Sequence, residues 1–186
     1  MASLTAPDVC AVAISGSPTA SSRSRRLLDR AVAQLALVGV HTTRIDLASV
    51  PADDLLGRTR TEAIQSALAE VARAHIVLVS TPVYRATYSG LLKVFFDLFQ
   101  PGALNGKVGV PFASGGSHSH QLVLDHGLRP LFASVGAVVV AAGVYASDAQ
   151  FHADGVDGAV TARIDRAVQE ALILARASDG ALVEQL

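Results

Sequence analysis

The sequence predicts an α/β protein built on a doubly wound, five-stranded parallel sheet with helices on both faces. Five apolar segments alternate along the chain with five amphipathic ones. Several of the apolar segments are apolar on both sides, which is typical of parallel strands covered by helices on both faces. Right-handed crossovers between such strands give an open, doubly wound sheet. A content of 51% hydrophobic and 17% charged residues fits a folded core.

The first half of the chain contains two strands and two helices. Val9–Ser15 is uniformly apolar up to its last residue and predicts a buried strand. Ser24–Leu37 has apolar residues at helical spacing, and Gly39 ends this helix. Val40–Leu47 alternates like a partly exposed strand, and Thr61–Ala74 predicts the second helix.

The second half continues the alternation and predicts no further domain. Its elements, in order, are a strand His75–Pro82, a helix Tyr88–Phe99, a strand Lys107–Ser114, a helical segment Ser119–Gly136, a strand Ala137–Ala146 and a helix Ala159–Ala177. Two irregular segments, 47–60 and 147–158, are too short to be domain linkers. We therefore expect one domain over residues 1–186.

Charge and composition argue against several classes of protein. A formal net charge of −1 disfavours nucleic-acid binding through a general positive field. No apolar run reaches the roughly 18–20 residues that cross a bilayer, and no signal-peptide pattern opens the chain, so we expect a cytoplasmic protein without membrane contact. The single cysteine, Cys10, excludes a disulfide within the chain and is most simply a core residue.

Three loops together form a candidate ligand site. In doubly wound sheets, ligands bind beyond the carboxyl ends of the strands, where the strand order reverses. The loops that follow the first, third and fourth strands are 16–24, 81–90 and 114–120, and all three are rich in small and hydroxyl residues. We call them loop one, loop two and loop three.

Loop one has the composition of a phosphate site. It opens on Gly16 and leads into a helix N-terminus, where free N–H groups and the helix dipole favour an anion. Ser17, Ser22 and Ser24 supply hydroxyls, and Arg23 supplies charge. The loop matches neither the dinucleotide G-x-G-x-x-G pattern nor the Walker pattern, which favours a phosphomonoester held without Mg²⁺. An ordinary helix N-cap in a polar loop is the alternative.

Loop two supplies an aromatic ring, and loop three supplies glycines whose backbone can lie close to a ligand. Tyr84 offers the aromatic ring, although packing against its own helix would also explain it. Gly115 and Gly116 would let backbone approach a flat ligand. His118 and His120 lack a third metal ligand at a clear spacing, so we expect no metal. No catalytic acid–base pair or nucleophile is recognisable, which suits a cofactor that carries the reaction.

Four segments together resemble the NAD(P)H-dependent FMN reductase family with a flavodoxin-like fold. They are SGSPTASSRS, STPVYRATYSGLLKVFFDLF, LNGKVGVPFASGGSHSHQLVLDHGLRPLF and GVYASDAQF. Within the family, the chain is most similar to the reductase component of alkanesulfonate-type two-component monooxygenase systems. The resemblance covers roughly residues 9–175 and implies the strand order 2-1-3-4-5.

The resemblance also implies a function and a site. NADPH or NADH would reduce FMN, and reduced FMN would pass to a partner monooxygenase in sulfur assimilation. The family pattern places three sets of residues around the flavin: Ser17, Ser22, Arg23 and Ser24 at the phosphate, Pro82, Val83 and Tyr84 along the isoalloxazine, and Ser114, Gly115, Gly116 and Ser117 at its other edge.

Two other functions remain open at this stage. A quinone or azo reductase would share the fold and keep its FMN, and a flavodoxin-like electron carrier would have no enzymatic activity. The chain has no Trp and three Tyr, so loops two and three cannot sandwich a flavin between two aromatic rings. We expect one flavin face to stay open for the nicotinamide, and the rings to stack for hydride transfer.

The segment around His126 predicts an irregular helix. Pro130 cannot donate to the carbonyl of His126, and Gly127 lies beside it, so we expect a local bulge or kink there. The corresponding helix of the resembling reductases carries a π-type insertion, often with Tyr in place of His126, which is associated with flavin release and assembly. We therefore expect His126 at a subunit interface near the flavin. A histidine that only caps the kink is the alternative.

The helix Tyr88–Phe99 is apolar over about half of its circumference, which predicts a homo-oligomer. Its apolar face and flanks comprise Tyr88, Leu91, Leu92, Val94, Phe95, Phe96, Leu98 and Phe99. Its polar side comprises Ser89, Gly90, Lys93 and Asp97. An apolar arc this wide exceeds what a surface helix buries within one chain, so we expect a dimer or a tetramer.

Overall fold

The computed structural model describes residues 9–153 and 155–183, and its centre is a parallel sheet. The order along the sheet is β2-β1-β3-β4-β5, as predicted, and β6 also pairs with β4. The strands are β1 (Cys10–Ser15), β2 (His41–Asp46), β3 (Ile76–Pro82), β4 (Val108–Gly115), β5 (Val138–Val139) and β6 (Val144–Ser147). In register, Ser15 lies beside Ser80, and Pro82 lies beside Ser114. The carboxyl ends of β1, β3 and β4 therefore meet at one edge.

The expected single strand Ala137–Ala146 is interrupted, which corrects the sequence prediction. Its two halves, β5 and β6, pair with the beginning and the end of β4. Between them, Arg129 donates to the carbonyls of Val140 and Ala141 at 2.8 and 2.7 Å. Glu170 accepts from the N–H of Ala141 at 2.6 Å. Side chains thus replace the strand ladder here, and the backbone polar groups stay satisfied.

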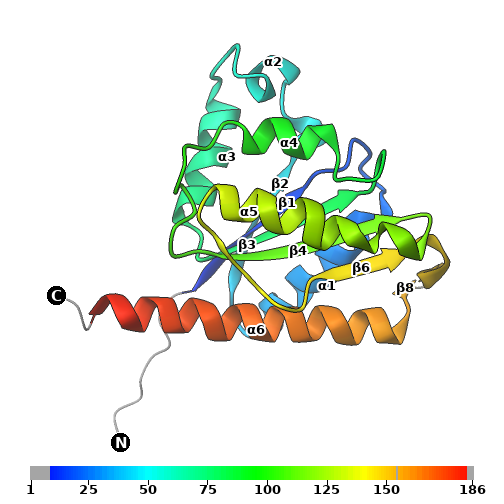
Figure 1. Cartoon of the computed structure of the whole chain (residues 1–186). Coiled ribbons are helices and arrows are strands. Elements are labelled where there is room, and N and C mark those ends of the chain that lie inside the picture. The colour runs from blue at the N-terminus through cyan, green and yellow to red at the C-terminus, as the bar shows by residue number, and fades with distance from the viewer. Residues whose placement is uncertain (1–8, 154, 184–186) are drawn as a thin grey trace, which may run out of the picture.

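Helices cover both faces of the sheet (Figure 1). One face packs against α1 (Arg23–Leu37) and α6 (Gly158–Val183), and the other packs against α3 (Glu62–Arg73), α4 (Gly90–Phe96) and α5 (Arg129–Ser134). Side chains of β1 alternate between the two cores, because successive residues of a strand point to opposite faces. None of the helices in the described ranges is both long and apolar enough to cross a membrane.

Several expected boundaries differ from the structure. The helix expected over Ser119–Gly136 is a 3₁₀ segment, a π-helix at Leu124–Leu128 and α5. The π-helix confirms the predicted irregularity at His126. The two segments expected to be irregular contain the short helix α2 (Ala52–Leu55) and the hairpin β7 (Phe151–His152) with β8 (Gly155–Val156). These elements are too short to produce a periodic sequence signal.

Helix α4 buries most of its apolar face within the chain. Leu92, Phe95 and Phe96 are fully or almost fully buried, and the Phe95 ring meets Phe99 edge-on with centroids 5.3 Å apart. The expected polar position of Ser89 is wrong: this residue is 2% exposed, because it is the N-cap of α4 rather than part of its outer face. Its contacts belong to the site described next.

Candidate functional site

A cavity of about 570 Å³ opens at the carboxyl edge of the sheet, and loops one, two and three all contribute to its wall. Its volume lies in the range of small-molecule and cofactor sites. The lining residues are Thr19, Ser21, Ser22, Arg23, Arg26, Pro82, Val83, Tyr84, Ser114, Gly115, Gly116 and Asp148. The structure therefore brings the three loops into one site.

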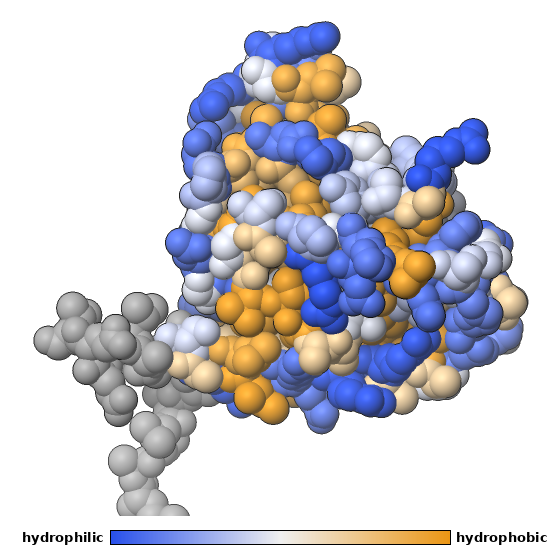
Figure 2. Space-filling model, in the orientation of Figure 1, coloured by the Kyte–Doolittle hydropathy of each residue, from blue (hydrophilic) through white to orange (hydrophobic). Residues whose placement is uncertain are grey.

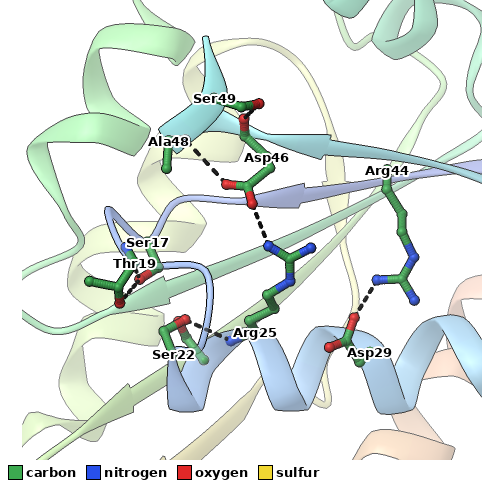
Figure 3. A network of polar contacts seen from close by, with 10 residues as sticks. Ser17, Thr19, Ser22, Arg25, Asp29, Arg44, Asp46, Ala48 and Ser49 are labelled. Atoms are coloured by element: carbon green, nitrogen blue, oxygen red, sulfur yellow. Dashed lines mark hydrogen bonds and ion pairs between the residues drawn. The ribbon is translucent and has the colours of Figure 1, made fainter.

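Loop one presents the N-terminus of α1 to this cavity. Ser22 is the N-cap, and its hydroxyl accepts from the N–H of Arg25 at 3.2 Å (Figure 3). The first N–H groups of a helix have no partner within the helix, so they are available to an anion. Ser22 and Arg23 line the cavity, and so do Thr19 and Ser21, which the sequence prediction missed.

Two of the expected phosphate ligands are turned into the protein. Ser17 and Ser24 are both fully buried and are not on the cavity wall. The Ser17 hydroxyl lies 3.3 Å from that of Thr19, and the Ser24 hydroxyl lies 3.2 Å from that of Ser22. Both serines therefore fix the shape of loop one in this structure.

The arginines at the start of α1 have different partners. Arg25 forms an ion pair with Asp46 (Figure 3), and neither residue is among those that line the cavity. Arg26 lines the cavity, but its guanidinium donates to the carbonyls of His152 and Gly155 at 2.7 and 2.6 Å. Arg23, which is about half exposed, faces the cavity and is 3.3 Å from the carboxylate of Asp148. Arg23 is thus the cation best placed for an anionic ligand.

A buried chain of hydrogen bonds joins loop one to loop two. The N–H of Gly16 donates to the carbonyl of Ser80 at 2.8 Å, and the carbonyl of Gly16 accepts from the hydroxyl of Ser89 at 2.5 Å. The N–H of Ser89 donates to the Thr81 hydroxyl at 2.9 Å, which in turn donates to the carbonyl of Pro82 at 2.9 Å. A Cβ at Gly16 would lie 2.9 Å from Leu92, so only glycine fits at this crossing.

Loop two holds Tyr84 at the start of a tight turn. Tyr84 and Thr87 exchange backbone hydrogen bonds of 2.9 and 3.2 Å. The two residues between them, Arg85 and Ala86, have φ angles of 50° and 68°. This left-handed geometry suits a two-residue hairpin turn but is strained for side chains other than those of Gly, Asn and Asp. The strain lies next to an aromatic ring that is 49% exposed.

Loop three is fixed by a hydrogen bond from Tyr145. The Tyr145 hydroxyl donates to the carbonyl of Ser117 at 2.6 Å. Burial, and to a lesser degree the charge of Asp148, raise the pKa of this phenol, so it remains a donor well above neutral pH. A Cβ at Gly115 would lie 2.9 Å from the Tyr145 hydroxyl, so glycine is needed for this packing. Ser117 itself is exposed and is not on the cavity wall.

The π-helix packs against the end of loop two. A Cβ at Gly127 would lie 3.1 Å from the ring of Tyr88 and 3.2 Å from the hydroxyl of Thr87. His126 is exposed on the same π-helix. Around His118 and His120, as elsewhere in the described parts of the chain, no three potential metal ligands are gathered.

Relatives of known function resemble the chain over most of its length. An FMN reductase (NADPH) of Pseudomonas putida is 37% identical over 87% of this chain and 81% of its own. The NADH-dependent FMN reductase SfnF of Pseudomonas putida is 42% identical over 73% of this chain and 76% of its own.

Solved structures show the same arrangement. The apo form of an NADH:FMN oxidoreductase (EMOB) matches with a TM-score of 0.82 and 33% identity, over 89% of both chains. A WrbA-like flavodoxin of Agrobacterium tumefaciens matches with a TM-score of 0.67 and 14% identity, over 92% of this chain and 99% of its own, which shows the shared fold alone. The family model described as NADPH-dependent FMN reductase matches residues 10–152. The chain therefore belongs to the NADPH-dependent FMN reductase family and has its flavodoxin-like fold.

Proposed function

We propose that the cavity binds FMN as a substrate, that NADPH or NADH reduces it there, and that reduced FMN leaves for a monooxygenase partner. The observation that carries the proposal is the meeting of loops one, two and three in one cavity, with a helix N-terminus and Arg23 at one end. Family membership supports the reductase activity, and its relatives include reductases named for NADPH and for NADH.

The flavin phosphate is assigned to the first turn of α1. Free N–H groups, the Ser22 and Ser21 hydroxyls and the Arg23 guanidinium converge there, and each favours a dianionic phosphomonoester. Ser17 and Ser24 support this site from within by hydrogen bonds inside loop one.

The isoalloxazine is assigned to the space between loops two and three. Pro82, Val83 and Tyr84 form one wall, and Ser114, Gly115 and Gly116 form the other. The nearest protein atom to a Cβ on Gly116 would be a carboxylate oxygen of Asp148, at 4.0 Å. The space beside this glycine is therefore open, and the edge of the flavin ring can approach its backbone. Tyr84 is the aromatic residue among those that line the cavity, which leaves one flavin face for the nicotinamide.

The chemistry belongs to the flavin, and the chain supplies the geometry. Bound FMN is the hydride acceptor for the reduced nicotinamide. The residues of this chain hold the phosphate, orient the ring through the fixed loops two and three, and leave the stacking face accessible. Stacking of the two rings is the condition for direct hydride transfer.

Delivery to a monooxygenase of sulfur assimilation, in the cytoplasm, is the finer part of the proposal. It rests on the resemblance to reductases of alkanesulfonate-type systems. The phosphate end of the cavity is suited to release, because its Arg23–Asp148 pair is about half exposed to solvent.

We further propose that the protein acts as a homo-oligomer, a dimer or a tetramer. Apolar surface lies between α5 and α6 (Figure 2). Val138 of β5 and Ile173 of α6 are apolar and are 52% and 67% exposed. A second copy of the chain would cover such surface. His126, exposed on the π-helix beside loop two, is assigned to this contact and to flavin release.

Purification and a nicotinamide-oxidation assay test the function. We expect a colourless protein that oxidises NADPH or NADH only when FMN is added. A yellow protein that reduces quinones or azo dyes without added FMN would instead be an FMN-retaining reductase. Absence of nicotinamide oxidation with every acceptor would contradict the proposed activity and leave an electron carrier.

A further inference from the structure

Asp148 is the one carboxylate among the described residues that line the cavity. It follows directly after β6, at the start of a 3₁₀ turn that ends at Gln150. The N–H of Ser147 donates to the Gln150 side chain at 3.0 Å, which completes a capping box. Local structure therefore holds Asp148 at the cavity independently of its ion pair.

The carboxylate lies between the phosphate end of the cavity and loop three. One oxygen is 3.3 Å from Arg23 Nη1 and 4.0 Å from the position that a Cβ of Gly116 would occupy. The side chains of Arg23 and Asp148 are 54% and 44% exposed. Asp148 thus lies on the cavity wall between loop one and loop three.

The cations of the cavity cannot neutralise both Asp148 and a phosphate. Arg26 is occupied by the carbonyls of His152 and Gly155. A phosphomonoester carries about 1.5 to 2 negative charges at neutral pH and must share Arg23 with Asp148. An exposed ion pair is weak and separates readily, so the phosphate can enter. The freed carboxylate then remains close to it and repels it.

We infer that Asp148 weakens FMN binding by competing with the flavin phosphate for Arg23, and that it thereby keeps FMN a releasable substrate. The inference rests on the proposed function, which places the phosphate at Arg23. It makes Asp148 an affinity-determining residue for phosphorylated flavins and leaves riboflavin, which lacks the phosphate, unaffected.

The test measures the dissociation constants of FMN and of riboflavin by the quenching of flavin fluorescence. The proteins compared are wild type, Asp148→Asn, Arg23→Ala and the double variant. Asp148→Asn keeps the shape and removes the charge. Asp165→Asn is the matched control, because Asp165 pairs with Arg30 at 3.1 Å with similar exposure and is not among the residues that line the cavity.

We expect Asp148→Asn to bind FMN about 1.5- to five-fold more tightly, the range set by a freed surface ion pair. Riboflavin binding and the Asp165→Asn control stay at wild-type values. The gain shrinks at high salt and in the Arg23→Ala background, where only direct repulsion remains. In steady state, the KM for FMN falls while kcat does not rise.

Unchanged or weaker FMN binding by Asp148→Asn would overturn the inference, as would an equal gain for riboflavin. Both results are distinct from failure of the proposed function. If the proposed function failed, the wild-type protein itself would bind neither FMN nor riboflavin.

Discussion

The hydroxyl of Ser89 donates a hydrogen bond of 2.5 Å to the carbonyl of Gly16, 73 residues earlier in the chain. The same hydroxyl accepts from the N–H of Leu92 at 3.1 Å and caps α4. One side chain therefore fixes the beginning of loop one against the end of loop two. The shape of the cavity depends on this contact.

Ser89→Ala should destabilise the fold by about 1–3 kcal/mol, because it removes a helix cap and leaves the buried Gly16 carbonyl unpaired. Urea unfolding measures the loss. Ser119→Ala is the control, since that exposed hydroxyl contacts only another exposed serine, and its effect should stay within about 0.5 kcal/mol. Equal effects of the two substitutions would show that the Ser89 contact is dispensable.

Arg23→Ala should weaken FMN binding by about 1.5–3 kcal/mol, the contribution of a hydrogen bond to a charged group. Riboflavin should bind the variant as it binds wild type. Arg30→Ala serves as the control, because Arg30 pairs with Asp165 and is not among the residues that line the cavity. An FMN affinity that survives the loss of Arg23 would place the phosphate elsewhere.

Ala86→Gly should raise the unfolding free energy by about 0.5–1 kcal/mol. Glycine removes the cost of the left-handed conformation, about 1–2 kcal/mol, and part of this gain is lost to the flexibility of the unfolded chain. Thermal unfolding should show an increase of about 1–4 °C. The same exchange at Ala69, exposed in α3, should destabilise by about 1 kcal/mol. A loss of stability at both positions would argue against a strained turn.

His126→Ala should change the oligomeric state or flavin release more than it changes folding. The side chain is exposed, so the unfolding free energy should move by less than about 0.5 kcal/mol. Sedimentation, single-turnover and steady-state NAD(P)H oxidation provide the readouts, and His41→Ala, exposed on β2, is the control. Unchanged assembly with unchanged turnover in both regimes would leave His126 as a helix-kink residue.

The sequence was most informative about the sheet and its irregular helix. Apolar runs such as His75–Pro82 mark buried strands without any tertiary information. Pro130 predicts an irregular helix around His126, and the family resemblance adds its π-type character. The break between β5 and β6 was not predictable in this way. It depends on Arg129 of α5 and Glu170 of α6, whose side chains bind the backbone at the break.

The site was only partly predictable for a related reason. A hydroxyl in a loop gives no sign of which way it points: Ser22 lines the cavity, whereas Ser24 is buried two residues later. Asp148 was missed because only the loops after the first, third and fourth strands were considered. Its position directly after β6, at the same edge of the sheet, was the available signal.

Release of reduced flavin is the central claim, and anaerobic titration tests it most directly. The protein is mixed with excess NADPH or NADH and with FMN in at least ten-fold excess over protein, and the loss of flavin absorbance is counted per protein molecule. Reduction of all the added FMN, with colourless protein recovered after desalting, is the predicted result. Reduction that stops at one FMN per protein, with the flavin still bound, would contradict the claim.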